Sequence, residues 1–211
     1  INGKKQKKVH SIVGLNEKRG ILWGYGVFEQ IFRDREITFV EPVFAEVGGG
    51  GAIGIRYCFY GYTLFVALTW QTRFGLESRE FPGGYREINQ AAEDAETAEV
   101  AEEGNIREEG KSINLTEKYC PGLTSAYRYV TEEHPGISVF AKEVPATAID
   151  WKQSPPVMKK EYQIAEEPQA ILEFYRIERV RTMKKFRQAN QHAALSLLEQ
   201  HLIDTGRCHL T

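Results

Sequence analysis

Apolar runs separated by turn-forming residues indicate strands in the first third of the chain. The runs Ile21–Trp23 and Ile37–Val40 are rich in β-prone residues, so we expect strands and turns over residues 9–47. After the glycine run at 48–51, which we interpret as a flexible joint, apolar segments over 51–59 and 63–70 predict a hairpin that turns near Gly61. This part of the chain therefore predicts β structure.

Helical and strand patterns alternate in the remainder. An acidic, alanine-rich segment predicts a helix over 91–103, and two β-prone segments predict strands over 126–131 and 137–144. The alanines that we expect to pack on a sheet are Ala91, Ala95 and Ala98. Segment 145–168 holds four prolines and predicts a long loop, whereas 168–203 predicts one or two helices. The order of elements indicates an α+β protein.

Three glutamates give the 91–103 helix its chemistry. Glu99, Glu102 and Glu103 are spaced i, i+3 and i+4, which places them on one helix face. Like charges at this spacing repel, and a divalent cation would reverse the sign of that interaction. Carboxylate oxygens are the ligands that Mg²⁺ or Mn²⁺ prefers. The alternative interpretation is a solvated acidic face.

The surrounding residues resemble the Nudix box, G-x5-E-x7-R-E-U-x-E-E-x-G-U, in which U is a bulky apolar residue. Gly84 stands at the first glycine, and the core R-E-U-x-E-E corresponds to residues 98–103. The glutamates that hold metals in this family are all present. The departures are Gln90 for the first Glu, Ala98 for the Arg and Asn105 for the last Gly. Asn tolerates a left-handed helix end almost as Gly does, so we expect Asn105 to keep the backbone of that position.

Flanking segments resemble the ADP-ribose and nucleotide-sugar pyrophosphatase branch of that family. The strand 63–70, then Gln71-Thr72-Arg73 and Glu80-Phe81-Pro82-Gly83-Gly84, follow the order of that branch, and Pro121-Gly122 resembles its S-P-G-x-T segment. The resemblance implies a Nudix-type α/β/α sandwich with a mixed β-sheet. It implies an N-terminal β extension over 1–50, a Nudix domain over 51–175 and a C-terminal helical extension over 176–211.

The resemblance also assigns roles. It implies that Glu99, Glu102 and Glu103 hold Mg²⁺ or Mn²⁺, with a backbone carbonyl at Gly83 or Gly84 as an additional ligand. It places Arg73, Glu80, Gly83 and Gly84 beside the substrate. The branch takes its general base from a late loop, which favours Glu161, with Asp150 as the second candidate. Tyr127, Tyr129 and Trp70 are candidates for stacking on a base, although core packing is the favoured interpretation of each.

Composition narrows the partners and the cellular compartment that we expect for this chain. The formal net charge of −2 gives no indication of a nucleic-acid or membrane partner, and no apolar run reaches the ~18 to 20 residues of a membrane span. Cys58, Cys120 and Cys208 form neither a C-x-x-C motif nor an even set, which favours a reducing cytoplasm. A basic face over 176–187 predicts either a solvated helix surface or a contact with phosphates or an acidic partner.

Two classes of function are consistent with these residues. The first is metal-dependent hydrolysis of the pyrophosphate bond in a nucleoside diphosphate linked to another group. The second is a catalytically impaired Nudix module that binds nucleotide, RNA or a protein partner, as the losses at Gln90 and Ala98 would allow. The N-terminal sheet of the resembled branch often pairs two subunits, which implies a homodimer.

Overall fold

The computed structural model describes the backbone alone in one part of the chain and the backbone with its side chains in another. It gives the backbone alone for residues 6–16, 21–32 and 35–46, and backbone with side chains for residues 50–72, 75–87, 89–107, 110–121, 136–165, 170–186 and 188–207, with the backbone alone at residue 73. The predicted strand over 126–131, with Tyr127 and Tyr129, and Cys208 lie outside these residues.

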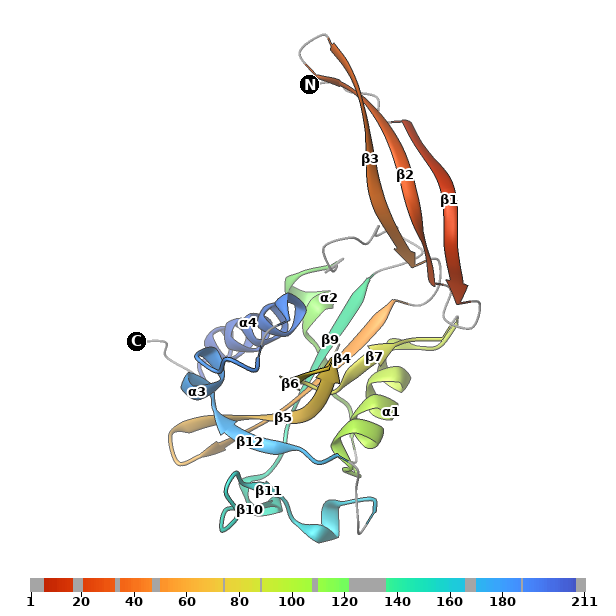
Figure 1. Ribbon diagram of the computed structural model, residues 1–211. Helices are drawn as coiled ribbons and strands as arrows, with labels where there is room; N and C mark the ends of the chain where they lie inside the picture. Colours follow the sequence, from red (N-terminus) through yellow and green to blue (C-terminus); the bar gives the residue numbers. More distant parts are fainter. Residues whose placement is uncertain are drawn as a thin grey trace.

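The N-terminal strands form a sheet of their own. They are β1 (Gln6–Asn16), β2 (Ile21–Phe32) and β3 (Arg35–Glu46). β2 pairs antiparallel with both neighbours, and this three-stranded sheet projects from one end of the molecule (Figure 1). The expectation of strands over 9–47 is confirmed, whereas pairing of two subunits through this sheet remains a prediction.

The described remainder contains a nine-stranded sheet with four α-helices. Its strands are β4 (Gly51–Tyr60), β5 (Thr63–Arg73), β6 (Leu76–Glu80), β7 (Gly83–Tyr85), β8 (Ile113–Asn114), β9 (Ile137–Glu143), β10 (Ile149–Asp150), β11 (Val157–Met158) and β12 (Glu173–Arg176). The helices are α1 (Ala92–Gly104), α2 (Leu115–Tyr119), α3 (Ile177–Arg181) and α4 (Ala189–Asp204), and two 3-10 helices are η1 (Ala146–Ala148) and η2 (Lys160–Tyr162).

The sheet is mixed. Its strand order is β10-β11-β12-β5-β4-β9-β8, with β6 added to β5 and β7 added to β4. β4 and β9 run parallel, whereas the other pairs are antiparallel. The predicted hairpin is β4–β5, and Gly61 at its turn has φ +61°, a left-handed conformation that glycine adopts without strain. The predicted strand over 137–144 is β9.

Helices cover both faces of the central strands, with α1 on one side and α4 on the other (Figure 1). Along β4, Ile53, Ile55 and Tyr57 join the apolar cluster that contains Leu198 of α4, whereas Cys58 joins the cluster that contains Val100 of α1. This alternation is the period-two pattern of a strand buried on both faces. The predicted α/β/α sandwich with a mixed sheet is confirmed. Helices of the predicted 176–211 extension share one core with residues of 51–175.

The packing face of α1 differs from the predicted alanine stripe. Ala95 is buried, but Ala91 and Ala98 are exposed. The face that meets the sheet instead carries Glu96, whose carboxylate forms a buried ion pair with Arg56 of β4. A charged residue is among the least expected core residues, since burial requires a partner that lies elsewhere in the sequence.

Two predictions for the last third were wrong. Segment 145–168 contains short strands and 3-10 helices rather than an irregular loop, and β12 stands where the first part of a helix was expected. The neighbouring residues Phe174 and Tyr175 are both buried but belong to different apolar clusters. Adjacent side chains that enter apolar clusters on opposite sides indicate a strand between the two clusters. The sequence does not reveal this difference, because two consecutive apolar residues also occur in a buried helix.

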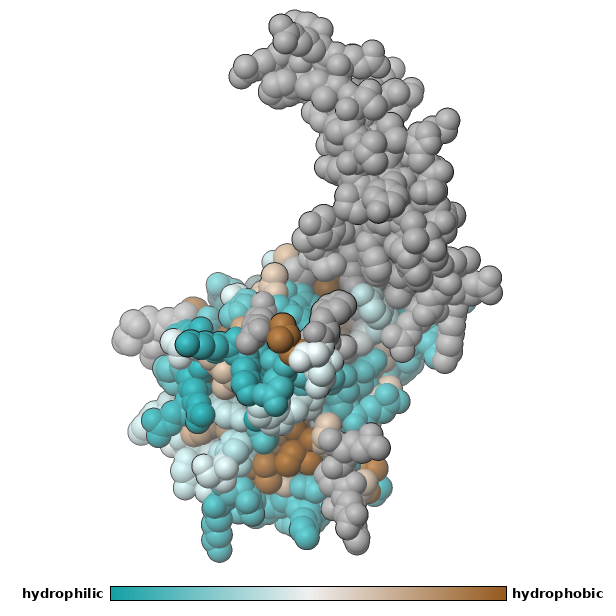
Figure 2. All heavy atoms as spheres, viewed as in Figure 1, coloured by the Kyte–Doolittle hydropathy of each residue, from teal (hydrophilic) through white to brown (hydrophobic). Residues whose placement is uncertain are grey.

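The face in Figure 2 is largely hydrophilic, with apolar residues in small groups. Among the described residues no helix has the length and apolar character needed to cross a membrane.

Candidate functional site

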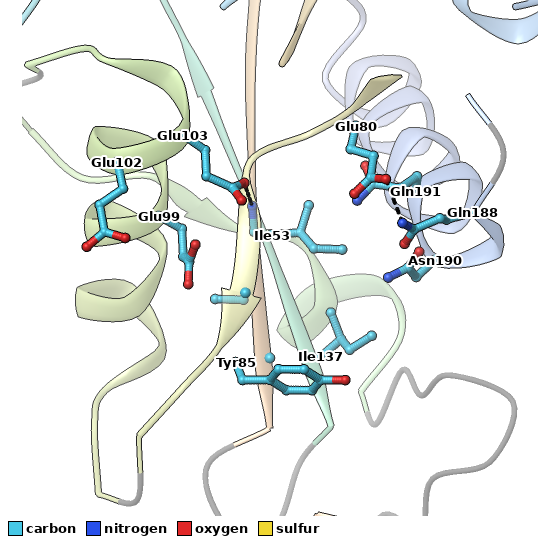
Figure 3. Close-up of a pocket in the computed structure, with 14 residues that line it drawn as sticks. Ile53, Glu80, Tyr85, Glu99, Glu102, Glu103, Ile137, Gln188, Asn190 and Gln191 are labelled. Carbon is cyan, nitrogen blue, oxygen red and sulfur yellow. Dashed lines mark hydrogen bonds between the residues drawn. The ribbon is translucent and has the colours of Figure 1, made fainter. Parts of the chain in front are cut away.

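A cavity of about 390 Å³ lies between α1 and α4, above the ends of the central strands (Figure 3). Residues from six described elements or their flanks meet there. Its lining consists of Gly51, Ala52, Ile53, Glu80, Gly83, Gly84, Tyr85, Glu99, Glu102, Glu103, Ile137, Gln188, Asn190 and Gln191. One wall is acidic and one carries amides, and the two face each other across an apolar floor.

The acidic wall is built by the C-terminal half of α1. Glu99, Glu102 and Glu103 all line the cavity, as the i, i+3, i+4 spacing predicted. Glu103 is held in place from both sides: its Oε2 accepts from the Gly83 N–H at 2.9 Å and its Oε1 accepts from Gln71 Nε2 at 2.5 Å. The Glu103 carbonyl accepts from Thr69 Oγ1 at 2.8 Å, which ties the end of the helix to β5.

Glycine at position 84 allows the close approach of the second glutamate. A methyl group on Gly84 would overlap the carboxylate of Glu99. The Gly83 backbone also lies close to β4, since a methyl group there would meet the carbonyl of Ala52. Both glycines therefore bring the backbone of β7 against the acidic wall, where any side chain would displace a carboxylate or a strand.

The chemistry of the acidic wall fits a hard divalent cation. It offers only carboxylate and carbonyl oxygens, which are the donors that Mg²⁺ and Mn²⁺ prefer. As the side chains lie, no group of His, Cys, Asp or Glu in the described residues converges closely enough to hold an ion. Glu103 is turned toward Gly83 and Gln71, and Glu102 toward solvent (Figure 3). Joint coordination therefore requires new rotamers of these side chains.

The departures from the box pattern lie outside the cavity lining. Ala98 is exposed, and the Gln90 side chain accepts from the Glu87 N–H at 2.9 Å within the turn that precedes α1. The changes at these two positions therefore leave the lining of the acidic wall intact.

The third departure, Asn105, keeps the expected backbone and adds a contact. It ends α1 with φ 54° and ψ 37°, the left-handed conformation predicted for this position. Its side chain also exchanges two hydrogen bonds with Ala165, from Nδ2 to the carbonyl at 3.1 Å and from the Ala165 N–H to Oδ1 at 2.9 Å. A glycine could not make this clamp between the end of α1 and the segment after η2.

The amide wall comes from the N-terminal turn of α4 and was not predicted. Gln188 Nε2 donates to Glu80 Oε1 at 2.6 Å, and Gln191 Oε1 accepts from the Phe81 N–H at 2.7 Å. Asn190 lies between these two anchored glutamines and lines the cavity. The available signal was the amide-rich start of α4 at residues 188–191, where a helix usually carries a capping Ser, Thr or Asp.

The remaining predicted site residues have different positions. Glu80 lines the cavity with only 2% of its surface exposed, and its contact with a substrate stays a prediction. The side chain of Arg73 lies outside the described residues. Glu161 lies exposed on η2, Asp150 lies half-buried on β10, and neither lines the cavity. The η2 turn is bound to the segment after α1 through the Arg107 N–H and the Tyr162 carbonyl at 2.9 Å. This geometry does not support Glu161 as the base.

Side chains of the predicted basic face have local partners. Arg181 pairs with Glu199 at 2.8 Å, and Lys185 pairs with Glu77, which lowers the pKa of the Glu77 carboxyl through their hydrogen bond. The Arg79 guanidinium lies 3.4 Å from the centroid of the Trp70 ring, and Trp70 does not line the cavity. These contacts favour the solvated-surface interpretation of the basic face and remove Trp70 as a stacking residue in the cavity.

Comparison with known proteins supports the architecture. Solved structures with a similar fold include an ADP compounds hydrolase, with a TM-score of 0.53 at 12% identity over 96% of this chain and 97% of that chain. They also include the NUDIX domain of Shewanella oneidensis NrtR complexed with ADP ribose, with a TM-score of 0.50 at 12% identity over 74% and 90%. Neither a family model nor a curated protein sequence matches this chain. The helix-covered mixed sheet and these neighbours together show that the chain has the Nudix fold.

Proposed function

We propose that this cavity hydrolyses the pyrophosphate bond of a nucleoside diphosphate linked to another group, of the ADP-ribose or nucleotide-sugar kind. Glu99, Glu102 and Glu103 hold Mg²⁺ or Mn²⁺ there, and the carbonyl of Gly83 is an additional ligand. The observation that carries the proposal is the placement of these glutamates in one cavity beside the Gly83–Gly84 backbone, with the box departures outside its lining.

The residues in and around the acidic wall have different roles in this proposal. A bound divalent cation neutralises phosphate charge and lowers the pKa of a coordinated water. As the side chains lie, Gly83 and Gln71 keep the Glu103 carboxylate at the cavity wall by hydrogen bonds, and sharing a cation with the other glutamates requires a rotation from this position. Glu99 is positioned by the space that Gly84 leaves open. The Arg56–Glu96 ion pair holds the helix that carries these side chains against β4.

The solved neighbours support the choice of substrate class. One is an ADP compounds hydrolase, and the other is a Nudix domain bound to ADP ribose. The fold provides a scaffold with many uses, so the substrate assignment rests on the carboxylates and glycines of the cavity.

A substrate panel with and without metal tests the proposal. ADP-ribose, nucleotide sugars, dinucleoside polyphosphates and nucleoside triphosphates are each incubated with Mg²⁺ or Mn²⁺, and release of nucleoside monophosphate is followed by chromatography. We expect release from ADP-ribose or a nucleotide sugar that depends on the cation and is lost in Glu103→Gln. Glu93→Gln, an exposed glutamate in the first turn of α1, is the matched control and should retain activity. No cation-dependent release from any substrate would refute the proposal.

A binding module without catalysis is the second candidate. The observation that favours it is the spread of the α1 carboxylates, which as they lie do not converge on an ion. This candidate predicts that the protein binds ADP-ribose with the same affinity in the presence and absence of Mg²⁺ and leaves it intact.

A further inference from the structure

Asn190 is a polar side chain in the cavity with no assigned role. It is half-buried in the first turn of α4, and its amide forms no hydrogen bond with any part of the chain that the structure describes. Figure 3 shows it directed into the space between α4 and the central strands, opposite the acidic wall. An amide in this position offers both a donor and an acceptor to whatever fills the cavity.

The position of Asn190 is set by its neighbours on the helix. Gln191, only 3% exposed, accepts from the Phe81 N–H, and Gln188 donates to Glu80. These bonds join the start of α4 to the end of β6, directly before the Gly83–Gly84 backbone of the acidic wall. Because both flanking amides are engaged, the first turn of α4 is held at one distance from the α1 glutamates. Such support is what a substrate-positioning side chain requires.

The surroundings of Asn190 select the chemistry of its ligand. The wall carries neutral amides and the buried carboxylate of Glu80, and the floor carries Ile53 and Ile137. None of the described residues that line the cavity is a Lys or an Arg, so a phosphate group beside Asn190 would meet no cation of the lining. A sugar offers hydroxyl groups that exchange hydrogen bonds with an amide, while its carbon skeleton can rest on the isoleucines.

We propose that Asn190 binds a sugar hydroxyl of the substrate and favours sugar-linked over phosphate-extended nucleotides. The diphosphate then lies at the α1 wall, and the sugar extends from it toward α4. This inference rests on the proposed function of the cavity, and it narrows the linked group to a neutral, hydroxyl-bearing one. Asn190 acts as a specificity-determining residue, since its loss affects one substrate class and not the other.

Asn190→Ala tests this assignment with ADP-ribose and ATP as probes. The substitution raises helix propensity at an accessible position, so the fold is retained, as the thermal midpoint will show. We expect KM for ADP-ribose to rise about tenfold with kcat changed less than about twofold, since one hydrogen bond of binding is lost. KM for ATP should stay unchanged. Gln200→Ala removes an exposed amide from the far end of α4 and is the matched control, with no expected effect on either substrate.

Calorimetric binding of ADP-ribose without metal separates this inference from the proposed function. If the protein binds ADP-ribose but does not hydrolyse it, a weaker affinity in Asn190→Ala still supports the assignment while the hydrolase proposal fails. If hydrolysis occurs and Asn190→Ala leaves KM and affinity for ADP-ribose unchanged, or raises KM for both substrates equally, the assignment is wrong and the hydrolase proposal stands. Absence of binding of ADP-ribose by the wild-type protein overturns the assignment as well.

Discussion

The two walls of the cavity use opposite chemistry and opposite means of support. The α1 wall carries three carboxylates whose mutual repulsion favours a bound cation, and a buried ion pair fastens the helix to the sheet. The α4 wall carries neutral amides, and its helix is held by an apolar core and by two hydrogen bonds to the end of β6. An acidic wall suits a divalent cation that in turn binds the phosphates of a nucleotide, and a neutral wall suits the organic end of the nucleotide. The changes below either perturb the acidic wall and the helix that carries it or lie outside both walls, and all leave the α4 wall intact.

The largest expected effect comes from the buried ion pair beneath the acidic wall. Glu96→Gln leaves the Arg56 guanidinium buried beside a neutral amide, and both side chains are at most 3% exposed in the native pair. We expect the free energy of unfolding to fall by about 3 to 5 kcal/mol, measured by urea denaturation. The double variant Glu96→Leu with Arg56→Met should regain most of that loss, because no charge then remains buried. A loss below about 1 kcal/mol in Glu96→Gln would show that the pair does not support α1.

Gly84→Ala perturbs the acidic wall without changing any charge. The added methyl group overlaps the Glu99 carboxylate, which must rotate away. A displacement of about 1 Å at a reacting centre costs about 100-fold in rate, so we expect kcat for ADP-ribose to fall by about that factor. The affinity for ADP-ribose without metal should change much less if the α4 wall binds the sugar. Unchanged kcat in steady-state assays would mean that the position of Glu99 is not important for the reaction.

Asn105→Gly restores the box pattern and should nevertheless destabilise the protein. Glycine adopts the left-handed conformation more easily, but the two hydrogen bonds to Ala165 are lost. With each such bond worth about 0.5 to 1.5 kcal/mol, we expect a net loss of about 1 kcal/mol in urea denaturation. A gain in stability would show that the clamp contributes nothing beyond the backbone conformation.

The smallest expected effect belongs to a residue that lies outside both walls. Glu161→Gln should lower kcat less than about tenfold, because a positioned base typically contributes about 100-fold or more and Glu161 lies exposed on η2 outside the cavity. Steady-state kinetics on ADP-ribose measures this. A loss of two decades or more, about the contribution of a positioned base, would show that the η2 turn moves over the substrate and that Glu161 is the base after all.

The acidic wall was predictable because its information is local. Glu99, Glu102 and Glu103 share one helix, so their spacing alone places them on one face, and the glycines at 83 and 84 lie within 20 positions upstream of Glu103. The hairpin at Gly61 and the left-handed conformation of Asn105 were predictable for the same reason, since each depends on a few adjacent residues.

The amide wall was not predictable because it forms only in the folded protein. Phe81 and Gln191 are 110 positions apart, and Gln188 and Glu80 are 108 positions apart. The same limit applies to the Arg56–Glu96 pair, which replaced the expected alanine stripe, and to β12, whose Phe174 and Tyr175 are buried in separate clusters. In each case the burial of a residue depends on a distant partner that no local pattern reveals.

Titration of Mn²⁺ into the 211-residue chain by calorimetry tests the central claim most directly. Three proteins are compared: the wild type, Glu103→Gln in the acidic wall, and Glu93→Gln in the exposed first turn of the same helix. If the α1 glutamates hold the metal, Glu103→Gln weakens the affinity at least about tenfold because a charged oxygen ligand is lost, and Glu93→Gln matches the wild type. Equal affinity in all three proteins would contradict the assignment of a metal site to this wall.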